Sequence, residues 1–561
     1  MEEIWQELKP YKGSFFNGQW PTVTEMFNIT LSRFPDRPCF SAYNPDRICY
    51  TYKEVHEIVK RTASKMIEDG VKRGDRVLLN GKNSIQWGVS YLAINYCGAV
   101  VVPIDNQMDV SRCETLSEFA GCSYVLADSS VIEKMNSSSR WFKNLKGVVS
   151  LQELLDLKPE KLYDSVFISD EDIAALLFTS GTTGNEKAAV LTNRNIVSDT
   201  YLVADGMGCT EKDTLYALLP LHHSYCCTTV LLEAVMHGAE CLFAQGVILS
   251  HMLKDLKNGH VTIFMGIPLL YNKLLAGIEK GMARKGKFVN RLLHIMMSIN
   301  GWTKQHMHFS PFRGFFRKHI LSQLGLDKNN LLICGAGPLS PEVFRKYNQL
   351  GLDFVQGYGL TECAPVVTLN PKEHFKTASI GKALKGMDVI IADPDEHGVG
   401  EIRVKGPNVT RGYYKDRENT ENLFDENGYL KTGDLASVDS EGYFFIRGRA
   451  KNIIVTEGGK NVYPEEIEDY FQTNQAIEQI MVRGYMADKN VPSEQIEAVI
   501  FPSKDFYKGV APEKIENDIR EQVKHVNSNL PLYKRIEKIT IIKERMKETT
   551  TRKIKRNTVS A

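Results

Sequence analysis

Apolar residues along the first two thirds of the chain alternate between two spacings. In Glu54–Gly70 they recur every three or four residues, which predicts an amphipathic helix. Arg76–Asn80 is a short continuous apolar run, as expected of a strand buried on both faces. Ser340 and Pro341 suit the N-cap and first position of a further helix. The alternation continues through Tyr91–Ile104, Glu240–Ala244, Val261–Pro268 and Leu331–Tyr347. It predicts an α/β fold with buried parallel strands.

The pattern changes twice in the last third of the chain. After Ile380, short apolar strands are separated by Gly, Asp and Asn at intervals typical of hairpins. From Tyr463 onward, a helix, two strands and a long helix indicate a small α+β unit. We therefore predict a large N-terminal domain of parallel α/β layers over 1–447, a β-rich subdomain within it over 381–447, a hinge over 448–452, and a smaller α+β C-terminal lid domain over 453–561.

Composition narrows the class of protein. The chain has 561 residues, 43% of them hydrophobic, which is too long for one core and predicts several domains. The net charge of +1 argues against general binding of nucleic acid. No run approaches the ~18 apolar residues of a membrane span, and the polar, acidic first residues do not predict a signal peptide. Eleven cysteines without a Cys-x-x-Cys pair predict reduced, buried thiols in a cytoplasmic protein.

A loop of small residues provides the first candidate for chemistry. Thr179–Gly184 reads TSGTTG between two apolar runs, and Lys187 follows. Consecutive backbone N–H groups and hydroxyls in such a loop can surround an anion, and a lysine adds a positive charge for a phosphate. The spacing differs from the Walker pattern because Glu186 stands at the position of its second glycine. Taken alone, the loop is also compatible with a plain surface turn.

Further motifs follow this loop in a fixed order. They are LPLHHSY (Leu219–Tyr225), GAGPLS (Gly335–Ser340), QGYGLTE (Gln356–Glu362), GEIRVKGPNVTRGYY (Gly400–Tyr414), YLKTGDLA (Tyr429–Ala436), the stretch Gly442–Glu468, and TTTRKIKR (Thr549–Arg556). Together with the loop they resemble the adenylate-forming superfamily, which contains acyl-CoA synthetases, luciferases and adenylation domains. The resemblance covers nearly the whole chain. Two departures, Glu186-Lys187-Ala188 for Pro-Lys-Gly and Arg552-Lys553 for Gly-Lys, keep both lysines.

The resemblance implies a two-step reaction with ATP, Mg²⁺ and coenzyme A. A carboxylate would attack the α-phosphate of ATP to give an acyl adenylate, and a thiol would then take the acyl group. Because the first step joins an anion to a polyanion, neutralising charge is the main task of the site. Read singly, a Thr-Glu pair, a Gly-Asp turn or a lysine in a basic tail has an ordinary structural explanation. The functional interpretation depends on all of them occurring together, in the order found in the adenylate-forming superfamily.

The resemblance also implies a role for each residue. The phosphates would be held by Thr179, Ser180, Gly181, Thr182, Thr183, Gly184 and Lys187. The rest of the nucleotide would be bound by Gly335, Ala336, Gly357, Tyr358, Asp434 and Arg449, with Tyr358 beside adenine and Asp434 on the ribose hydroxyls. The catalytic residues would be Thr361 at the α-phosphate, Glu362 as the Mg²⁺ ligand, His223 beside the acyl carboxylate, and Lys553 between carboxylate and α-phosphate.

The second step would use a rotation of the small domain about Lys451. That rotation would withdraw Lys553 and present Gly458 and Gly459 along the tunnel for the pantetheine of CoA. Glycines suit such a tunnel because a narrow ligand passes close to the backbone. His222 has no counterpart in the family pattern and is interpreted as a structural or pocket-lining histidine.

The identity of the acid is the least determined part of this interpretation. An elongated basic segment over 280–326, with nine Lys/Arg and no Asp or Glu, is similar to the long-chain fatty acyl-CoA synthetase branch. It could rest on the inner membrane surface or simply present solvated basic faces. We expect a medium- or long-chain fatty acid. An acyl carrier protein as acceptor, an aromatic or other bulky acid as substrate, and a non-enzymatic binding protein stay open as alternatives.

Overall fold

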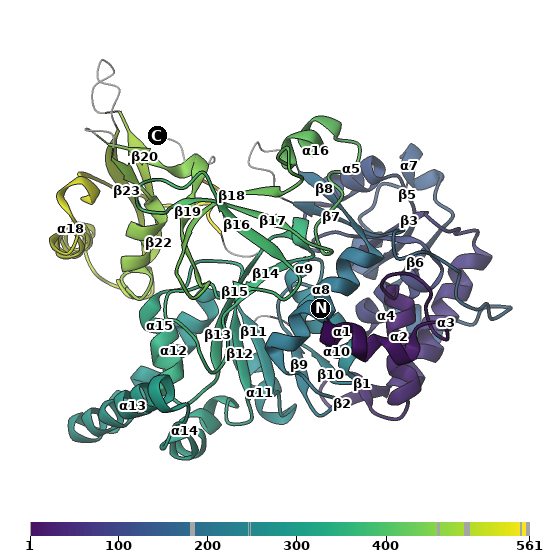
Figure 1. Ribbon diagram of the computed structural model, residues 1–561, viewed down its shortest axis with the longest axis horizontal. Coiled ribbons are helices and arrows are strands. Elements are labelled where there is room, and N and C mark those ends of the chain that lie inside the picture. The colour runs from purple at the N-terminus through teal and green to yellow at the C-terminus, as the bar shows by residue number, and fades with distance from the viewer. Residues whose placement is uncertain are drawn as a thin grey trace.

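Two large sheets with helices between them form most of the molecule (Figure 1). The computed structural model describes residues 2–137, 139–179, 186–244, 246, 248–456, 460–486, 494–549 and 553–556. Within these residues, the larger sheet has nine strands in the order β15 (Lys382–Ala383), β14 (Val366–Leu369), β13 (Phe354–Gly359), β12 (Leu331–Cys334), β11 (Ile263–Gly266), β9 (Thr214–Ala217), β10 (Glu240–Phe243), β1 (Pro38–Tyr43) and β2 (Arg47–Thr51). The six strands from β13 to β1 are parallel, and the edge strands are antiparallel.

The second sheet is also mostly parallel and has six strands in the described chain. Their order is β6 (Gly147–Ser150), β5 (Cys122–Ala127), β3 (Arg76–Asn80), β4 (Val100–Pro103), β7 (Ile173–Thr179) and β8 (Lys187–Thr192). All neighbours are parallel except β7 and β8, which run antiparallel on either side of the TSGTTG loop. The loop therefore projects from the end of a hairpin at the edge of this sheet.

Helices α4 (Ile85–Tyr96) and α8 (Asn193–Met207) lie between the two sheets. Helix α4 contacts strands β3 and β4 of one sheet and β1 of the other, and α8 contacts β7, β8 and β14. Nearly every residue of α4 is buried, which explains why its sequence is apolar on all sides. The amphipathic helices α2 (Val23–Arg33) and α3 (Tyr52–Glu68) pack beside them in the same core.

The remaining strands form smaller sheets. An antiparallel sheet contains β16 (Asp388–Ala392), β17 (Gly400–Lys405), β18 (Leu430–Val438) and β19 (Phe444–Arg449). The C-terminal region has a short pair, β20 (Ile454–Val455) with β21 (Asn461–Val462), and a sheet of β22 (Ile477–Tyr485), β23 (Gln495–Pro502) and β24 (Lys538–Ile541). Helices α17 (Pro464–Glu468) and α18 (Pro512–Ser528) belong to this region, which has its own hydrophobic cluster at one end of the molecule (Figure 1).

The predicted mixed α/β class with parallel sheets is confirmed. Helix α3 and strand β3 occupy the predicted positions, and the Ser340 side chain caps helix α15 (Pro341–Gln349) by accepting a hydrogen bond from the Glu342 N–H. All eleven cysteines are free thiols, and ten of them are buried. Among the described residues, no helix is both long and apolar enough to cross a membrane. The domain boundaries stay predictions.

The basic segment forms helices on the outside of the nine-stranded sheet. Helix α12 (Pro268–Ala283) leads into α13 (Lys287–Met307), the longest helix described, and α14 (Arg313–His319) follows. Part of the charge of this segment is internal. The buried Lys304 ammonium donates hydrogen bonds to Asn348 Oδ1 at 2.9 Å, to the Leu352 carbonyl at 2.6 Å and to Asp353 Oδ1 at 2.7 Å. These bonds fix α13 against α15 and the strand that follows it.

Candidate active site

The predicted site residues cluster where parallel strands of the large sheet end. Strand β9 leads to the loop that carries His223, β12 leads to Gly335 and Ala336, and β13 carries Tyr358 near its end with Thr361 just beyond. Because these strands are parallel, their carboxyl ends lie at one edge of the sheet, which is the usual ligand-binding edge of such folds.

Asp434 joins this edge to the antiparallel sheet. Its Oδ2 accepts a hydrogen bond of 2.8 Å from the Tyr358 hydroxyl, and its Oδ1 pairs with Arg449 Nε at 2.7 Å. The contact with Arg449 follows from the sheet register, because the two residues face each other across β18 and β19. Burial and the nearby Asp434 charge raise the pKa of Tyr358, so this hydroxyl stays protonated and donates. A buried carboxylate paired in this way is held in one orientation.

Glu362 and Lys187 meet through a tyrosine that the sequence analysis assigned no role. The Tyr413 hydroxyl donates a 2.7 Å hydrogen bond to Glu362 Oε1, and Lys187 Nζ lies 5.1 Å from the centre of the Tyr413 ring. Lys187 also donates a 2.5 Å hydrogen bond to Asn419 Oδ1. Thr179 pairs with Lys187 across the β7–β8 hairpin. The structure thus gathers the base of the loop, its lysine and the predicted metal ligand.

Some of the predicted site falls on residues whose placement is not described. Ser180, Gly181, Thr182, Thr183 and Gly184 of the loop lie outside the described residues. The predicted tunnel residues also lie outside them; these are Gly458 and Gly459.

Lys553 faces the same site from the C-terminal region. The residue is exposed at the surface, but part of its side chain is removed from water. This burial, together with the positive charge of Arg449, lowers the pKa of Lys553, while Asp434 opposes the shift. Lys553 also contributes to lowering the pKa of His223. The charges of Lys553, Arg449 and Asp434 therefore act on one another across the two parts of the chain, and Lys553 also disfavours a charge on His223.

The end of the chain that carries Lys553 is anchored to the C-terminal sheet. Arg556 donates to the Val482 carbonyl at 2.7 Å and to both carboxylate oxygens of Glu468 at 2.7 and 2.8 Å. The Lys553 carbonyl accepts from the Thr549 N–H at 2.8 Å. Burial raises the pKa of Glu468 to about 7, against the opposing charge of Arg556.

His222 and His223 form a neutral pair beside this cluster. Their ring centres are 4.3 Å apart. Burial lowers the pKa of His222 to about 4. Burial first, and then the neighbouring His222 and Lys553, lower the pKa of His223 to about 3, while Asp105 opposes the shift. His223 is therefore uncharged near neutral pH and can take part in hydrogen bonds without adding a charge.

Tight backbone geometry explains two small residues of the site. A β-carbon at Gly335 would come within 2.9 Å of the Tyr225 ring, so a side chain there requires that ring to move. Ala336 has φ of 64°, in the left-handed region. Gly357 is less constrained, with its nearest contacts at 3.3 Å. Gly359, to which the family resemblance gave no role, is tighter than Gly335 and Gly357: a β-carbon there would lie 2.1 Å from the Pro365 carbonyl oxygen.

A single glutamine ties the C-terminal region to the GAGPLS loop. Gln472 Oε1 accepts a 2.8 Å hydrogen bond from the Ser340 N–H, and its Nε2 donates to the Pro338 carbonyl at 3.2 Å. The Gln472 carbonyl accepts a further bond of 3.2 Å from Asn272 Nδ2. Gln472 Nε2 also donates to Asp469 Oδ1 at 2.5 Å. These bonds hold the orientation in which Lys553 faces the site.

The predicted hinge residue lies between the two parts. Lys451 belongs to a short 3₁₀ turn, Ala450–Asn452, directly after β19. Burial and the positive charges of Arg449 and Arg556 lower the pKa of Lys451. Its neighbour Asn452 donates a 2.6 Å hydrogen bond to Glu465.

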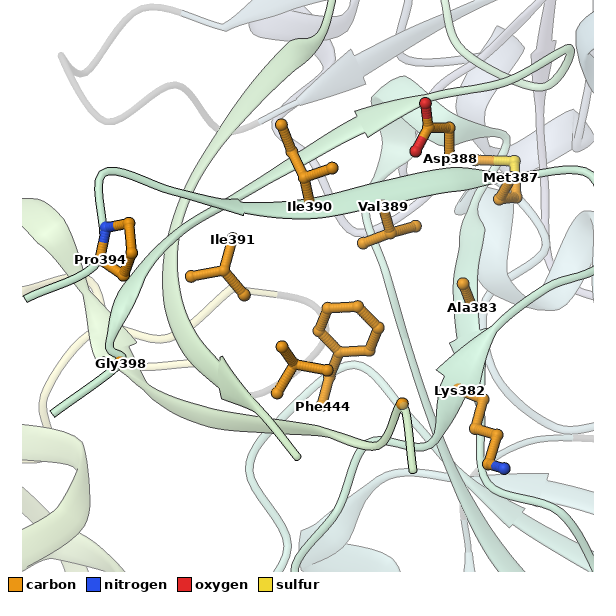
Figure 2. Close-up of a pocket in the computed structure, with 12 residues that line it drawn as sticks. Lys382, Ala383, Met387, Asp388, Val389, Ile390, Ile391, Pro394, Gly398 and Phe444 are labelled. Atoms are coloured by element: carbon orange, nitrogen blue, oxygen red, sulfur yellow. The ribbon is translucent and has the colours of Figure 1, made fainter. Parts of the chain in front are cut away.

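A hollow of about 760 Å³ lies away from this cluster, between β15, β16 and β19. Figure 2 shows Ala383, Val389, Ile391 and Phe444 around it, with Lys382 at its border. None of the described site residues lines it. The hollow is thus separate from the chemistry predicted from the motifs.

Comparison with known proteins agrees with the ordered motifs. Residues 27–414 match the family model described as AMP-binding enzyme, and residues 451–561 match the AMP-binding enzyme C-terminal domain. The chain belongs to the AMP-binding enzyme family. It is therefore an enzyme of the AMP-forming acid–thiol ligase type.

Individual relatives are distant. The chain is 26% identical to a long-chain-fatty-acid–CoA ligase of Mus musculus, over 80% of this chain and 72% of that one. It is 25% identical to a chloroplastic long-chain-fatty-acid–[acyl-carrier-protein] ligase of Arabidopsis thaliana, over 92% and 83%. ATP-bound MatB from Rhodopseudomonas palustris superposes with a TM-score of 0.74 at 24% identity, over 96% and 98% of the two chains, and this likeness shows a shared fold.

The donor set of this family member suits Mg²⁺ bound together with a substrate. Among the described residues, no group of three or more His, Cys, Asp or Glu could enclose a metal ion. Glu362 offers a single carboxylate, with one oxygen already accepting from Tyr413. Mg²⁺ typically uses one or two carboxylates and completes its shell with water and substrate phosphates. The site therefore fits a metal that arrives with a polyphosphate.

Replacing Gln472 tests the contact between the two parts of the chain. Gln472→Ala removes two hydrogen bonds to the GAGPLS loop, each contributing about 1 kcal/mol. We expect the orientation in which Lys553 faces the site to be destabilised by about 2 kcal/mol and ATP–pyrophosphate exchange to slow roughly tenfold or more. Thioester formation from supplied acyl adenylate should keep its rate. The control is Gln305→Ala, an exposed glutamine. Unchanged exchange in Gln472→Ala would contradict this role.

The neutral histidines predict a pH response. Burial holds the pKa of His223 near 3, below its ordinary value of about 6.5. The neutral ring therefore contributes fully to the free energy of unfolding above about pH 6.5, and this contribution is lost as the pH falls toward 3. ATP–pyrophosphate exchange should show no imidazole step near pH 6.5. His223→Gln should leave the shape of the profile unchanged. A step near pH 6.5 that disappears in His223→Gln would show that the ring is charged during turnover.

Proposed function

We propose that the protein activates a medium- or long-chain fatty acid with ATP and transfers the acyl group to coenzyme A. The observation that carries this proposal is the clustering of Asp434, Arg449 and Lys553, brought from two parts of the chain to the carboxyl edge of the large sheet. The fatty-acid ligases among the relatives support the choice of acid.

In the first half-reaction, a carboxylate oxygen of the acid bonds to the α-phosphorus of ATP and pyrophosphate leaves. Asp434 accepts hydrogen bonds from the ribose hydroxyls and keeps its orientation through Tyr358 and Arg449. Lys553 lies between the carboxylate and the α-phosphate and reduces the repulsion between them. Thr361 donates to the α-phosphate.

At the phosphate end, Thr179, Lys187 and the residues of the TSGTTG loop bind the β- and γ-phosphates. Lys187 exchanges its bond with Asn419 for one with a phosphate oxygen, while Tyr413 keeps the Glu362 carboxylate in place. Glu362 would hold Mg²⁺, which would supply positive charge to the polyphosphate. His223, uncharged, lines the approach of the acyl carboxylate.

In the second half-reaction, the thiol sulfur bonds to the acyl carbon, AMP leaves with the electron pair of the broken bond, and the thiol loses its proton. The C-terminal region turns about Lys451 and withdraws Lys553 from the site. Gln472 breaks its bonds to the GAGPLS loop during this movement. The contact between the C-terminal region and the large sheet consists of a few polar bonds, which suits an interface that opens in every catalytic cycle.

A carrier protein is the second candidate for the acceptor. The Arabidopsis thaliana relative, which matches 92% of this chain, is an acyl-carrier-protein ligase. In that case the phosphopantetheine thiol of a carrier replaces CoA, and the adenylation step stays the same.

A substrate screen tests the acid and the acceptor separately. ATP–pyrophosphate exchange is measured with saturated acids of increasing chain length and with aromatic acids. CoA or a phosphopantetheinylated carrier protein is then added. We expect fatty acids to stimulate ATP–pyrophosphate exchange, and we expect thioester to form with CoA but not with the carrier protein. Exchange restricted to aromatic acids refutes the fatty-acid assignment, and product formed only with the carrier selects the second acceptor.

Lys553→Ala tests the first half-reaction on its own. Losing a charge that acts mainly in the transition state should reduce adenylate formation about a hundredfold or more. Thioester formation from supplied acyl adenylate should persist. Lys555→Ala, two residues along the same segment, is the control and should retain adenylation. Adenylation at the native rate in Lys553→Ala would refute the assigned role.

A further inference from the structure

Helix α13 exposes a stripe of large apolar side chains along its outer face. The stripe consists of Phe288, Leu292, Ile295, Ile299 and Trp302. Spacings of four and three residues keep these side chains within a narrow sector of the helix. The first, Phe288, is 82% exposed and the last, Trp302, is 58% exposed. Between them the helix rises about 21 Å.

The opposite face of α13 is already packed against the protein. Its buried residues are Leu293, Met297, Asn300, Thr303 and Lys304. This face contacts helices α12 and α15, and the bonds of Lys304 to Asn348 and Asp353 fix the rotation of the helix. The stripe consequently cannot turn inward. Figure 1 shows α13 projecting from the body of the molecule.

Positive charge surrounds the beginning of this stripe. Four exposed basic residues lie at or just before the start of α13: Arg284, Lys285, Lys287 and Arg291. None of the four has an acidic partner among the described residues. The sequence contains no Asp or Glu from 281 to 326. Lys304 and Arg313, by contrast, are paired with Asp353, so the unpaired basic residues of α13 itself, Lys287 and Arg291, both lie near its beginning.

We propose that α13 binds an anionic phospholipid membrane in the plane of its surface. The apolar stripe would enter the boundary between headgroups and acyl chains, and the four basic residues would contact lipid phosphates. A long apolar face with cations at its border is the pattern of helices that lie in a membrane interface. The proposal is independent of which acid the enzyme activates.

Charge distinguishes this occupant from two others. A second copy of α13 would bring the same cations and, over 281–326, no carboxylate to meet them. An acidic carrier protein would match the cations but would not explain an apolar stripe about 21 Å long. An anionic bilayer satisfies both features at once.

Vesicle co-sedimentation tests the proposal with the full-length protein. Vesicles of phosphatidylcholine alone are compared with vesicles that also contain phosphatidylglycerol. We expect binding to the anionic vesicles, weakened by salt. The triple variant Phe288→Ser/Ile295→Ser/Trp302→Ser and the charge variant Lys287→Glu/Arg291→Glu should each bind at least about tenfold less. Phe167→Ser, at a 74% exposed side chain elsewhere, is the matched control and should bind normally.

Tryptophan fluorescence gives a second readout. Trp20, Trp87 and Trp141 are buried, whereas Trp302 is exposed on the stripe. Binding should shift the emission to shorter wavelength and make it sensitive to brominated lipid. The Trp302→Phe variant should lose the part of both signals that comes from the stripe, while it still sediments with the vesicles.

Several outcomes would overturn the proposal. One is no sedimentation with anionic vesicles, and another is native binding by the triple variant. A change of oligomeric state in the triple variant, without vesicle binding by the native protein, would assign the stripe to a second copy. Loss of reaction with carrier protein, again without vesicle binding, would assign it to that partner. ATP–pyrophosphate exchange by each variant verifies folding and separates this test from that of the proposed function.

Discussion

The pairing of one buried carboxylate determines how the parts of this molecule fit together. Asp434 lies on the antiparallel sheet, but the hydroxyl that it binds belongs to the nine-stranded sheet, through Tyr358. A carboxylate removed from water is costly unless it is paired, so Asp434 holds its partners Tyr358 and Arg449 in place. The same charges act on Lys553 from the C-terminal region. Residues from two sheets and from the C-terminal region are thereby oriented around a single acidic group.

The contact between the C-terminal region and the large sheet is of a different kind. It depends on hydrogen bonds of Gln472 to the GAGPLS loop and to Asn272, and no hydrophobic cluster formed by the described residues spans this contact. Polar contacts can exchange with water at little net cost. A region held this way can leave its position and return, whereas one held by a large apolar core cannot. The buried Asp434 pairing thus joins parts that stay together, whereas the polar Gln472 contact joins parts that can separate.

Local patterns in the sequence predicted the fold class and much of the site, because those features depend on neighbouring residues. Alternating periods indicated the parallel sheets, and short motifs contained Tyr358, Asp434 and Lys553. Contacts between distant segments were not visible. Tyr413 lay within a quoted motif, but its partner Glu362 is 51 positions away. The sequence of the basic segment showed how many positive charges it carries. It did not show which of them are neutralised, because Asp353, the partner of Lys304, lies outside the segment.

The anchoring of Arg556 has a mechanical consequence. Its bonds to Glu468 and Val482 fasten the last described residues to helix α17 and strand β22. Lys553, three positions earlier, cannot swing out as an independent tail while that clasp is intact. In the rotation proposed above, Lys553 therefore moves together with the C-terminal region, so one displacement would remove a cation and open the space that it occupied.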